Sequence, residues 1–151
     1  MAGMMQTQAG DAGAFKTFDL SRVPSPCFVV DEVAVRRNLS VLKDVADRSG
    51  AHVLSALKAF SMFSLAPVVR EYLEGTCASG LYEARLGREK YGGEVATFCA
   101  GYKTSEIDQI IGYSDHMIFN SPTRKTVSCQ TYVLLSMTLM WACVSTGALR
   151  R

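Results

Sequence analysis

From Pro24 to Ser121 the chain alternates between short apolar runs and longer stretches with apolar residues at helical spacing. The short runs are typical of buried parallel strands, and the longer stretches are typical of amphipathic helices. The pattern predicts strands at 27–30, 52–57, 76–79, 95–99 and 116–119. It predicts helices at 32–49, 65–73, 82–91 and 104–112. This alternation predicts an α/β fold in which parallel strands are joined by right-handed crossovers.

Residues at the predicted helix ends support this assignment. Asp31 precedes the first helix and Gly50 follows it, as expected of an N-cap and a C-cap. Pro67 stands in the first turn of the second helix, and Gly92-Gly93 follow the third. In the first helix, Val33, Leu39, Leu42 and Val45 are the expected buried positions. The helices are therefore predicted from their ends as well as from their periodicity.

Two architectures are compatible with five strands in this order. One is an open doubly wound sheet, and the other is part of a (β/α)8 TIM barrel. A dinucleotide-binding open sheet would carry GxGxxG after its first strand, where this chain has Asp31-Glu32-Val33. A Walker-type GxxxxGK is also absent from the sequence. A complete barrel needs about 250 residues, so this chain would supply about five βα units.

The composition is that of an ordinary globular domain and excludes several classes of protein. Apolar residues make up 48% of the 151 residues, charged residues 20%, and the net charge is +2, which excludes wholesale disorder and gives no reason to expect nucleic acid. We interpret residues 1–22 as a flexible leader, because they contain neither an apolar signal segment nor an arginine-rich amphipathic pattern. The expected compartment is the cytoplasm.

The cysteines predict neither a disulfide framework nor a zinc site. The chain has an odd number of them, without CxxC spacing and without pairing to its two histidines. We expect buried free thiols in a reducing compartment, and within strands we expect small apolar groups rather than nucleophiles. They are Cys27, Cys77, Cys99, Cys129 and Cys143.

Lys58 is the residue with the clearest chemical potential. It stands at the carboxyl end of the predicted strand 52–57, which is the end that faces the active site in a barrel. A lysine held against apolar walls can lose its proton and attack an aldehyde to form a Schiff base. The alternative is a strand-end lysine that reaches into water, and position alone favours that alternative.

The other polar candidates have simpler structural explanations. His52 and His116 lie at strand starts, opposite the expected site, so we expect packing or surface roles. Ser79-Gly80 ends the third predicted strand and either lines a site or turns the chain. Glu83 and Arg85 are predicted to lie on a solvated helix face.

Four segments in order and spacing resemble the carboxynorspermidine (carboxyspermidine) decarboxylases. The segments are Pro24–Asp31, Ala56–Phe60, Ala78–Gly87 and Tyr113–Ser121. The resemblance covers residues 23–121, and the wider group is similar to the fold-type III enzymes, which include alanine racemase and ornithine decarboxylase. These enzymes have a pyridoxal phosphate barrel followed by a β domain, so 23–121 is expected to be the N-terminal part of such a barrel.

The resemblance implies a lyase of polyamine biosynthesis. Lys58 would bind pyridoxal 5′-phosphate as a Schiff base and serve as the catalytic lysine, and no metal is implied. Carboxynorspermidine or carboxyspermidine would be decarboxylated to norspermidine or spermidine. The complete enzymes of the family are expected to be homodimers. A non-catalytic half barrel that binds pyridoxal phosphate, or an interaction module, is the alternative.

The resemblance ends after Ser121, and residues 122–151 are of a different character. Thr126–Leu149 is free of charge and long enough to span a membrane, but polar residues are scattered through it. We favour a shifted reading frame, because Met140-Trp141-Ala142 read out of frame forces Val-Gly. When the shifted frame is read on as far as Thr146, the possible codons permit Gly-Leu-Arg-Val-Asn. This segment resembles a later strand of the family. A truncated, inactive fragment is then expected; a membrane anchor and a novel tail are the alternatives.

Overall fold

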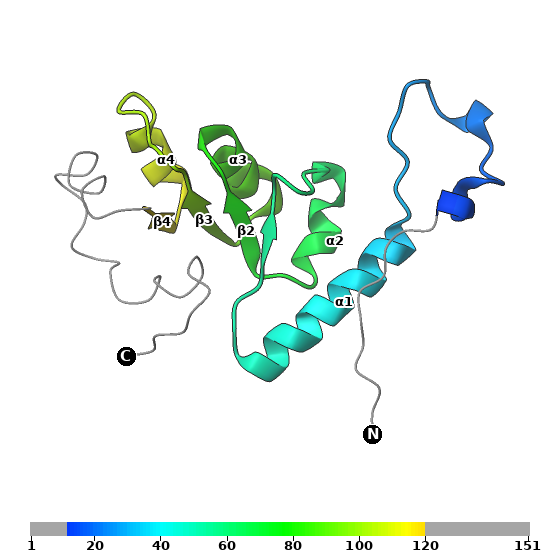
Figure 1. Cartoon of the computed structure of the whole chain (residues 1–151), viewed down its shortest axis with the longest axis horizontal. Coiled ribbons are helices and arrows are strands. Elements are labelled where there is room, and N and C mark those ends of the chain that lie inside the picture. The colour runs from blue at the N-terminus through cyan, green and yellow to red at the C-terminus, as the bar shows by residue number, and fades with distance from the viewer. Residues whose placement is uncertain (1–11, 120–151) are drawn as a thin grey trace. The chain divides into compact units, whose positions relative to one another are not determined.

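The computed structural model of this chain describes residues 12–119, which fall into two compact units (Figure 1). The first unit ends at Val53 and the second begins at Leu54. In the first unit, residues 12–22 of the predicted leader contain two short 3-10 helices, and residues 1–11 lie outside the described residues. The predicted apolar tail, 122–151, lies outside the described residues, and so do Cys129 and Cys143.

The first unit contains the predicted capped helix. Its elements are η1 (Ala12–Phe15), η2 (Leu20–Arg22) and α1 (Glu32–Ser49). Asp31 is the N-cap of α1, and its Oδ1 accepts hydrogen bonds from the backbone N–H groups of Val33 at 2.9 Å and Ala34 at 3.2 Å. Gly50 follows α1 with a φ of 68°, the left-handed conformation that favours glycine. Both ends of this helix are therefore determined locally.

The prediction of which α1 side chains are buried is partly wrong. Leu39 and Ala46 are buried, but Val33 and Val45 are 77% and 43% exposed. Leu39 and Ala46 are seven residues apart, which places them on the same side of a helix with 3.6 residues per turn. Val41 is buried as well, although it is two residues from Leu39 and lies on nearly the opposite side of the helix. The buried residues of α1 therefore do not form a single inner face.

The predicted first strand does not form. Residues 27–30 have no regular secondary structure, Phe28 is 94% exposed, and the Cys27 thiol is exposed instead of buried. A strand exists only where its backbone groups pair with a neighbouring strand. No ladder to residues 27–30 is formed within 12–119, so an apolar run by itself is not sufficient.

The second unit is a parallel four-stranded sheet with helical crossovers (Figure 1). The strand order is β1-β2-β3-β4, and each neighbouring pair is parallel. This confirms the α/β class and four of the five predicted strands. The elements are β1 (Leu54–Ala56), η3 (Phe63–Leu65), α2 (Ala66–Arg70), β2 (Gly75–Ala78), α3 (Leu81–Leu86), the π-helical η4 (Gly87–Tyr91), β3 (Glu94–Phe98), α4 (Ile107–Tyr113) and β4 (His116–Ile118).

Helices α3 and η4 pack closely on one face of the sheet. Ala78 of β2 and Val95 of β3 form a buried cluster with Ala84 of α3. Gly87 lies directly over Thr76, since a Cβ on Gly87 would be 2.4 Å from the Thr76 Oγ1. Side chains two apart on a strand share a face, so Thr76 and Ala78 both point toward these helices. The absence of a side chain at Gly87 is what permits this short distance between helix and sheet.

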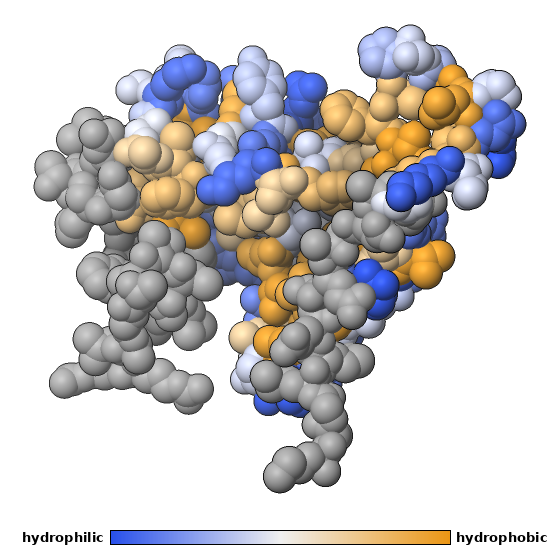
Figure 2. Space-filling view, turned by 45° about the vertical axis from the view of Figure 1, so that its right-hand side comes forward, coloured by the Kyte–Doolittle hydropathy of each residue, from blue (hydrophilic) through white to orange (hydrophobic). Residues whose placement is uncertain are grey.

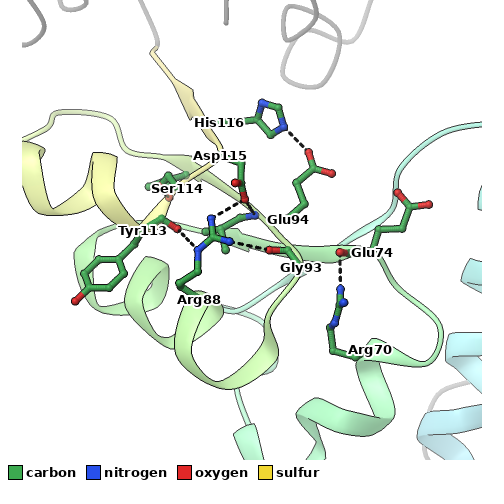
Figure 3. A network of polar contacts seen from close by, with 11 residues as sticks. Arg70, Glu74, Arg88, Gly93, Glu94, Tyr113, Ser114, Asp115 and His116 are labelled. Atoms are coloured by element: carbon green, nitrogen blue, oxygen red, sulfur yellow. Dashed lines mark hydrogen bonds and ion pairs between the residues drawn. The ribbon is translucent and has the colours of Figure 1, made fainter. Parts of the chain in front are cut away.

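A polar network joins η4 to the amino ends of β3 and β4 (Figure 3). Arg88 donates hydrogen bonds from Nε to the Tyr113 carbonyl at 3.1 Å and from Nη2 to Asp115 Oδ2 at 2.7 Å. The same Asp115 oxygen accepts the backbone N–H of Val95 at 2.8 Å. Asp115 thus connects a helix and two strands, and it lies at the edge opposite the carboxyl ends of the strands.

Several large apolar side chains remain exposed in the described part of the chain. Examples are Leu20, Phe63 and Tyr82, which are 76%, 57% and 79% exposed. Apolar patches are visible between polar residues on the face drawn in Figure 2. Within residues 12–119, no helix has the length and hydropathy required to span a bilayer.

Replacing Gly75 should separate β2 from β3. A Cβ at this position would lie 1.9 Å from the backbone oxygen of Glu94, its neighbour in the ladder. We expect Gly75→Ala to lower the free energy of unfolding by about 3 kcal/mol, measured by urea denaturation. Gly112→Ala is the matched control, because no atom lies within 4 Å of its added Cβ. It should raise stability by about 0.5–1 kcal/mol; equal effects of the two changes would contradict the packing described.

Removing the Asp115 carboxylate should weaken the attachment of η4 to the sheet, which depends on hydrogen bonds to this carboxylate. Asp115→Ala leaves the Val95 N–H without its acceptor and Arg88 without its ion pair. Because Arg88 and Asp115 are partly exposed, we expect a loss of about 1–2 kcal/mol in the free energy of unfolding. The exposed pair Arg85–Glu89, at 3.7 Å, provides the control: Glu89→Ala should cost less than about 0.5 kcal/mol. A loss no larger for Asp115→Ala than for this control would refute the assignment.

Candidate functional site

The carboxyl ends of the four strands meet at one edge of the sheet, because all strands are parallel. The segments that follow them begin at Leu57, Ser79, Cys99 and Phe119. In an α/β fold this edge is where ligands bind. Lys58 is the second residue after β1, so the structure places the predicted lysine at this edge.

A tight turn directs the chain out of the sheet at Lys58. Leu57 is 1% exposed, and its N–H donates to the Cys77 carbonyl of β2 at 3.1 Å. The N–H groups of Ala59 and Phe60 both donate to the Ala56 carbonyl, at 3.0 and 3.2 Å. Lys58 lies between these bonds and is exposed. Within residues 12–119, its ammonium group has neither an ion pair nor a hydrogen bond.

At the end of β2, Glu83 contacts the backbone of the preceding turn. Its Oε2 accepts the Ser79 N–H at 2.8 Å, and Gly80 is the N-cap of α3 with extended backbone. Glu83 is half-exposed, and the prediction of a solvated helix face did not include this hydrogen bond. Arg85, in contrast, is exposed and pairs with Glu89 on the outside of the helix, as predicted. Sequence reasoning had one available signal, which was the position of a glutamate in the first turn of a helix.

Tyr102 joins the carboxyl ends of β3 and β4, and the sequence analysis did not identify it. Its hydroxyl lies 2.8 Å from the Thr97 carbonyl and 3.0 Å from the Ile118 carbonyl, and it donates to this pair. Its ring packs against Phe119 with centroids 5.0 Å apart. Burial raises the pKa of Tyr102 to about 12, so the hydroxyl stays protonated and remains a donor at neutral pH.

The cysteines of the sheet differ from their predicted environment. Cys77 and Cys99 are only half-buried, and Cys99 lies just after β3 instead of within it. The Cys99 Sγ donates to the Gly101 carbonyl at 3.1 Å. The ladder between β3 and β4 ends at Phe98 and Ile118. The Cys99–Gly101 bond lies in the turn that follows. Neither Cys77 nor Cys99 forms a disulfide within residues 12–119.

Lys103 is the other lysine close to this edge, but its amine is engaged. Its Nζ lies 2.9 Å from Glu106 Oε1. This hydrogen bond and the charge of Glu106 raise the pKa of Lys103, so less of it exists as a nucleophilic free base at neutral pH. Lys58 has no such partner within 12–119, and it is therefore the better candidate nucleophile.

Both histidines lie away from the carboxyl edge, as predicted. His116 is the first residue of β4, and its Nε2 lies 2.6 Å from Oε1 of Glu94, the first residue of β3 (Figure 3). His52 is exposed and precedes β1 by two residues. His116 is therefore a partner in a pair at the amino ends of the strands and does not approach Lys58.

No protein-family model matches this chain. Curated relatives do match it over about two thirds of its length. The carboxynorspermidine/carboxyspermidine decarboxylase of Herminiimonas arsenicoxydans is 40% identical over 99 residues, which are 66% of this chain and 27% of that protein. The enzyme of the same name from Campylobacter jejuni subsp. jejuni is 37% identical over 100 residues, 66% of this chain and 26% of that protein.

A third relative has a different named substrate. The carboxyaminopropylagmatine decarboxylase of a Synechocystis species is 38% identical over 102 residues, 68% of this chain and 26% of that protein. This chain therefore spans only about a quarter of the length of the curated relatives that it matches.

A solved structure extends the similarity to the backbone. The carboxynorspermidine decarboxylase of Campylobacter jejuni, crystallised with norspermidine, superposes with a TM-score of 0.67 at 35% identity. The match covers 70% of this chain and 29% of that chain. The sequence relatives and the solved structure thus confirm the predicted relationship: over about two thirds of its length, this chain is homologous to the carboxynorspermidine/carboxyspermidine decarboxylases.

Proposed function

We propose that this chain carries the lysine-bearing part of a pyridoxal phosphate-dependent decarboxylase that acts on carboxynorspermidine or carboxyspermidine. The observation that supports the proposal is the exposed Lys58 at the carboxyl end of β1, which has no partner within residues 12–119 and belongs to a chain similar in structure to a decarboxylase. The names of the relatives supply the reaction and the substrate class. The lysine supplies the chemistry that such a reaction requires.

The residues at this edge fit pyridoxal phosphate. The cofactor needs a primary amine that can attack its aldehyde, and Lys58 offers one outside the sheet and without a competing carboxylate in the described part of the chain. The turn of residues 57–60 is anchored at both ends by backbone hydrogen bonds, so the base of this side chain is fixed. Its flexible end remains free to reach a ligand beside the strand ends.

Lys58 would have two tasks. Its Nζ would hold the cofactor covalently until the substrate amine replaces it, and the released amine would then carry a proton at Nζ and deliver it to the substrate carbon that lost carboxylate. Pyridoxal phosphate, when bound, supplies an electron-poor ring that accepts the electron pair left by carbon dioxide. The buried Leu57 would close the site on the side of the sheet and exclude water there.

We also propose that the four strands are part of a (β/α)8 barrel, with the site at its carboxyl edge. The parallel order β1-β2-β3-β4 and the TM-score of 0.67 to a decarboxylase structure support this architecture. Cytoplasmic location and a homodimer of the complete enzyme stay predictions. Both would agree with a soluble enzyme of small-molecule metabolism.

Borohydride reduction in the presence of pyridoxal phosphate should fix the cofactor to the peptide that contains Lys58. The reason is that Lys58 has a free amine at the ligand-binding edge, whereas Lys43 and Lys103 are paired with Asp47 and Glu106. Peptide mapping by mass spectrometry identifies the labelled residue. Lys58→Ala should lose the label, and Lys103→Ala is the matched control that should keep it. Labelling mainly of Lys43 or Lys103 would disprove the assignment.

The 151-residue chain alone should have little or no decarboxylase activity. Its described residues provide four strands and one candidate lysine, while the phosphate sites of barrels are formed by later loops. Release of carbon dioxide from carboxynorspermidine or carboxyspermidine measures the activity directly. A version completed with the remaining part of a relative should be active, and Lys58→Ala in that version should remove most of the activity. Turnover by the 151-residue chain at the rate of complete relatives would contradict the expectation.

A further inference from the structure

The hydrogen bond between Ser79 and Glu83 interrupts the pairing of β1 with β2 at a particular point. In the parallel ladder, Ala56 is the partner of Cys77, and the Leu57 N–H donates to the Cys77 carbonyl at 3.1 Å. The next bond of an evenly spaced parallel ladder would run from the Ser79 N–H to the Leu57 carbonyl. The Ser79 N–H instead donates to Glu83 Oε2 at 2.8 Å. The ladder therefore ends at Leu57, immediately before Lys58.

The end of the ladder determines how the chain continues at Lys58. Because the Leu57 carbonyl is not paired with β2, the following residues turn away, and Ala59 and Phe60 both donate to the Ala56 carbonyl. If Ser79 paired with Leu57, Lys58 would be held in register beside the next residue of β2. Glu83 is a half-exposed residue in the first turn of α3, so its position is set by the helix and not by the strand.

We propose that Glu83 is a positioning residue for Lys58. By binding the Ser79 N–H, it ends the β1–β2 ladder one residue before the lysine and leaves the Lys58 amine in an exposed turn. The inference rests on the proposed function, because the benefit of this placement is access of an aldehyde cofactor to Lys58. It adds to that function a residue that does not contact the cofactor and acts through the backbone.

The hydrogen bond to the Ser79 N–H depends more on the presence of an acceptor oxygen at residue 83 than on its negative charge. A hydrogen bond from a backbone N–H requires an acceptor oxygen at the right distance, and glutamine retains one such oxygen while alanine does not. Glu83→Gln should therefore preserve the bond, and Glu83→Ala should release the Ser79 N–H. The matched surface control is Glu89→Ala, which removes a carboxylate from the adjoining η4, where it contacts Arg85.

The test measures labelling of Lys58 by pyridoxal phosphate, with Lys103 as the internal reference. Each chain is mixed with the cofactor and reduced with borohydride, and the ratio of labelled Lys58 to labelled Lys103 is determined by peptide mapping. The loss of one hydrogen bond corresponds to roughly a tenfold change in a local equilibrium. We expect the ratio to fall about tenfold in Glu83→Ala and to stay within about twofold of the wild type in Glu83→Gln and Glu89→Ala.

Amide hydrogen exchange at Ser79 provides a second measurement that does not depend on the cofactor. Exchange should become faster in Glu83→Ala and remain slow in Glu83→Gln, with far-UV circular dichroism unchanged in both. An unaltered labelling ratio in Glu83→Ala, despite faster exchange at Ser79, would overturn the inference while the proposed function stands. An equal fall in Glu89→Ala would also overturn it. A wild-type chain labelled at Lys103 but not at Lys58 would overturn the proposed function as well.

Discussion

Pairing of backbone groups between parallel strands is the constraint on which the rest of this structure depends. Each strand from β1 to β4 exists because it has a hydrogen-bonded neighbour in register. The apolar run at 27–30 has the composition of a strand but no such neighbour among the described residues, and it forms none. The close spacing of β2 and β3 at Gly75 and Glu94 leaves no room even for a methyl group.

The two edges of the sheet are built differently, and the difference has a physical basis. At the amino edge, polar side chains are paired: Arg88 with Asp115, and His116 with Glu94. At the carboxyl edge, Tyr102 and Glu83 bind backbone groups of the strand ends. A hydroxyl, a carboxylate and backbone groups thus provide these contacts, and within residues 12–119 the Lys58 amine takes part in none of them. The Lys58 side chain is exposed in this arrangement.

The similarity to decarboxylases covers different shares of this chain and of its relatives. The matched region covers about two thirds of the chain but only about a quarter of the curated relatives. In this chain, Lys58 lies just after β1 at the carboxyl edge of the sheet. The names of the relatives state their own substrates, whereas the exposure of Lys58 follows from the turn at 57–60.

The sequence by itself determined the features that depend on neighbouring residues. Asp31 and Gly50 cap α1 through contacts within four residues, and the strand–helix alternation from β1 to β4 follows from local apolar periodicity. The place of Lys58 at a strand end was predictable for the same reason. Only the tertiary structure decided which apolar run becomes a strand and which polar groups meet. Tyr102 reaches Ile118 across 16 positions, and Arg88 reaches Asp115 across 27. Such contacts depend on strand register and helix packing, which no local pattern encodes.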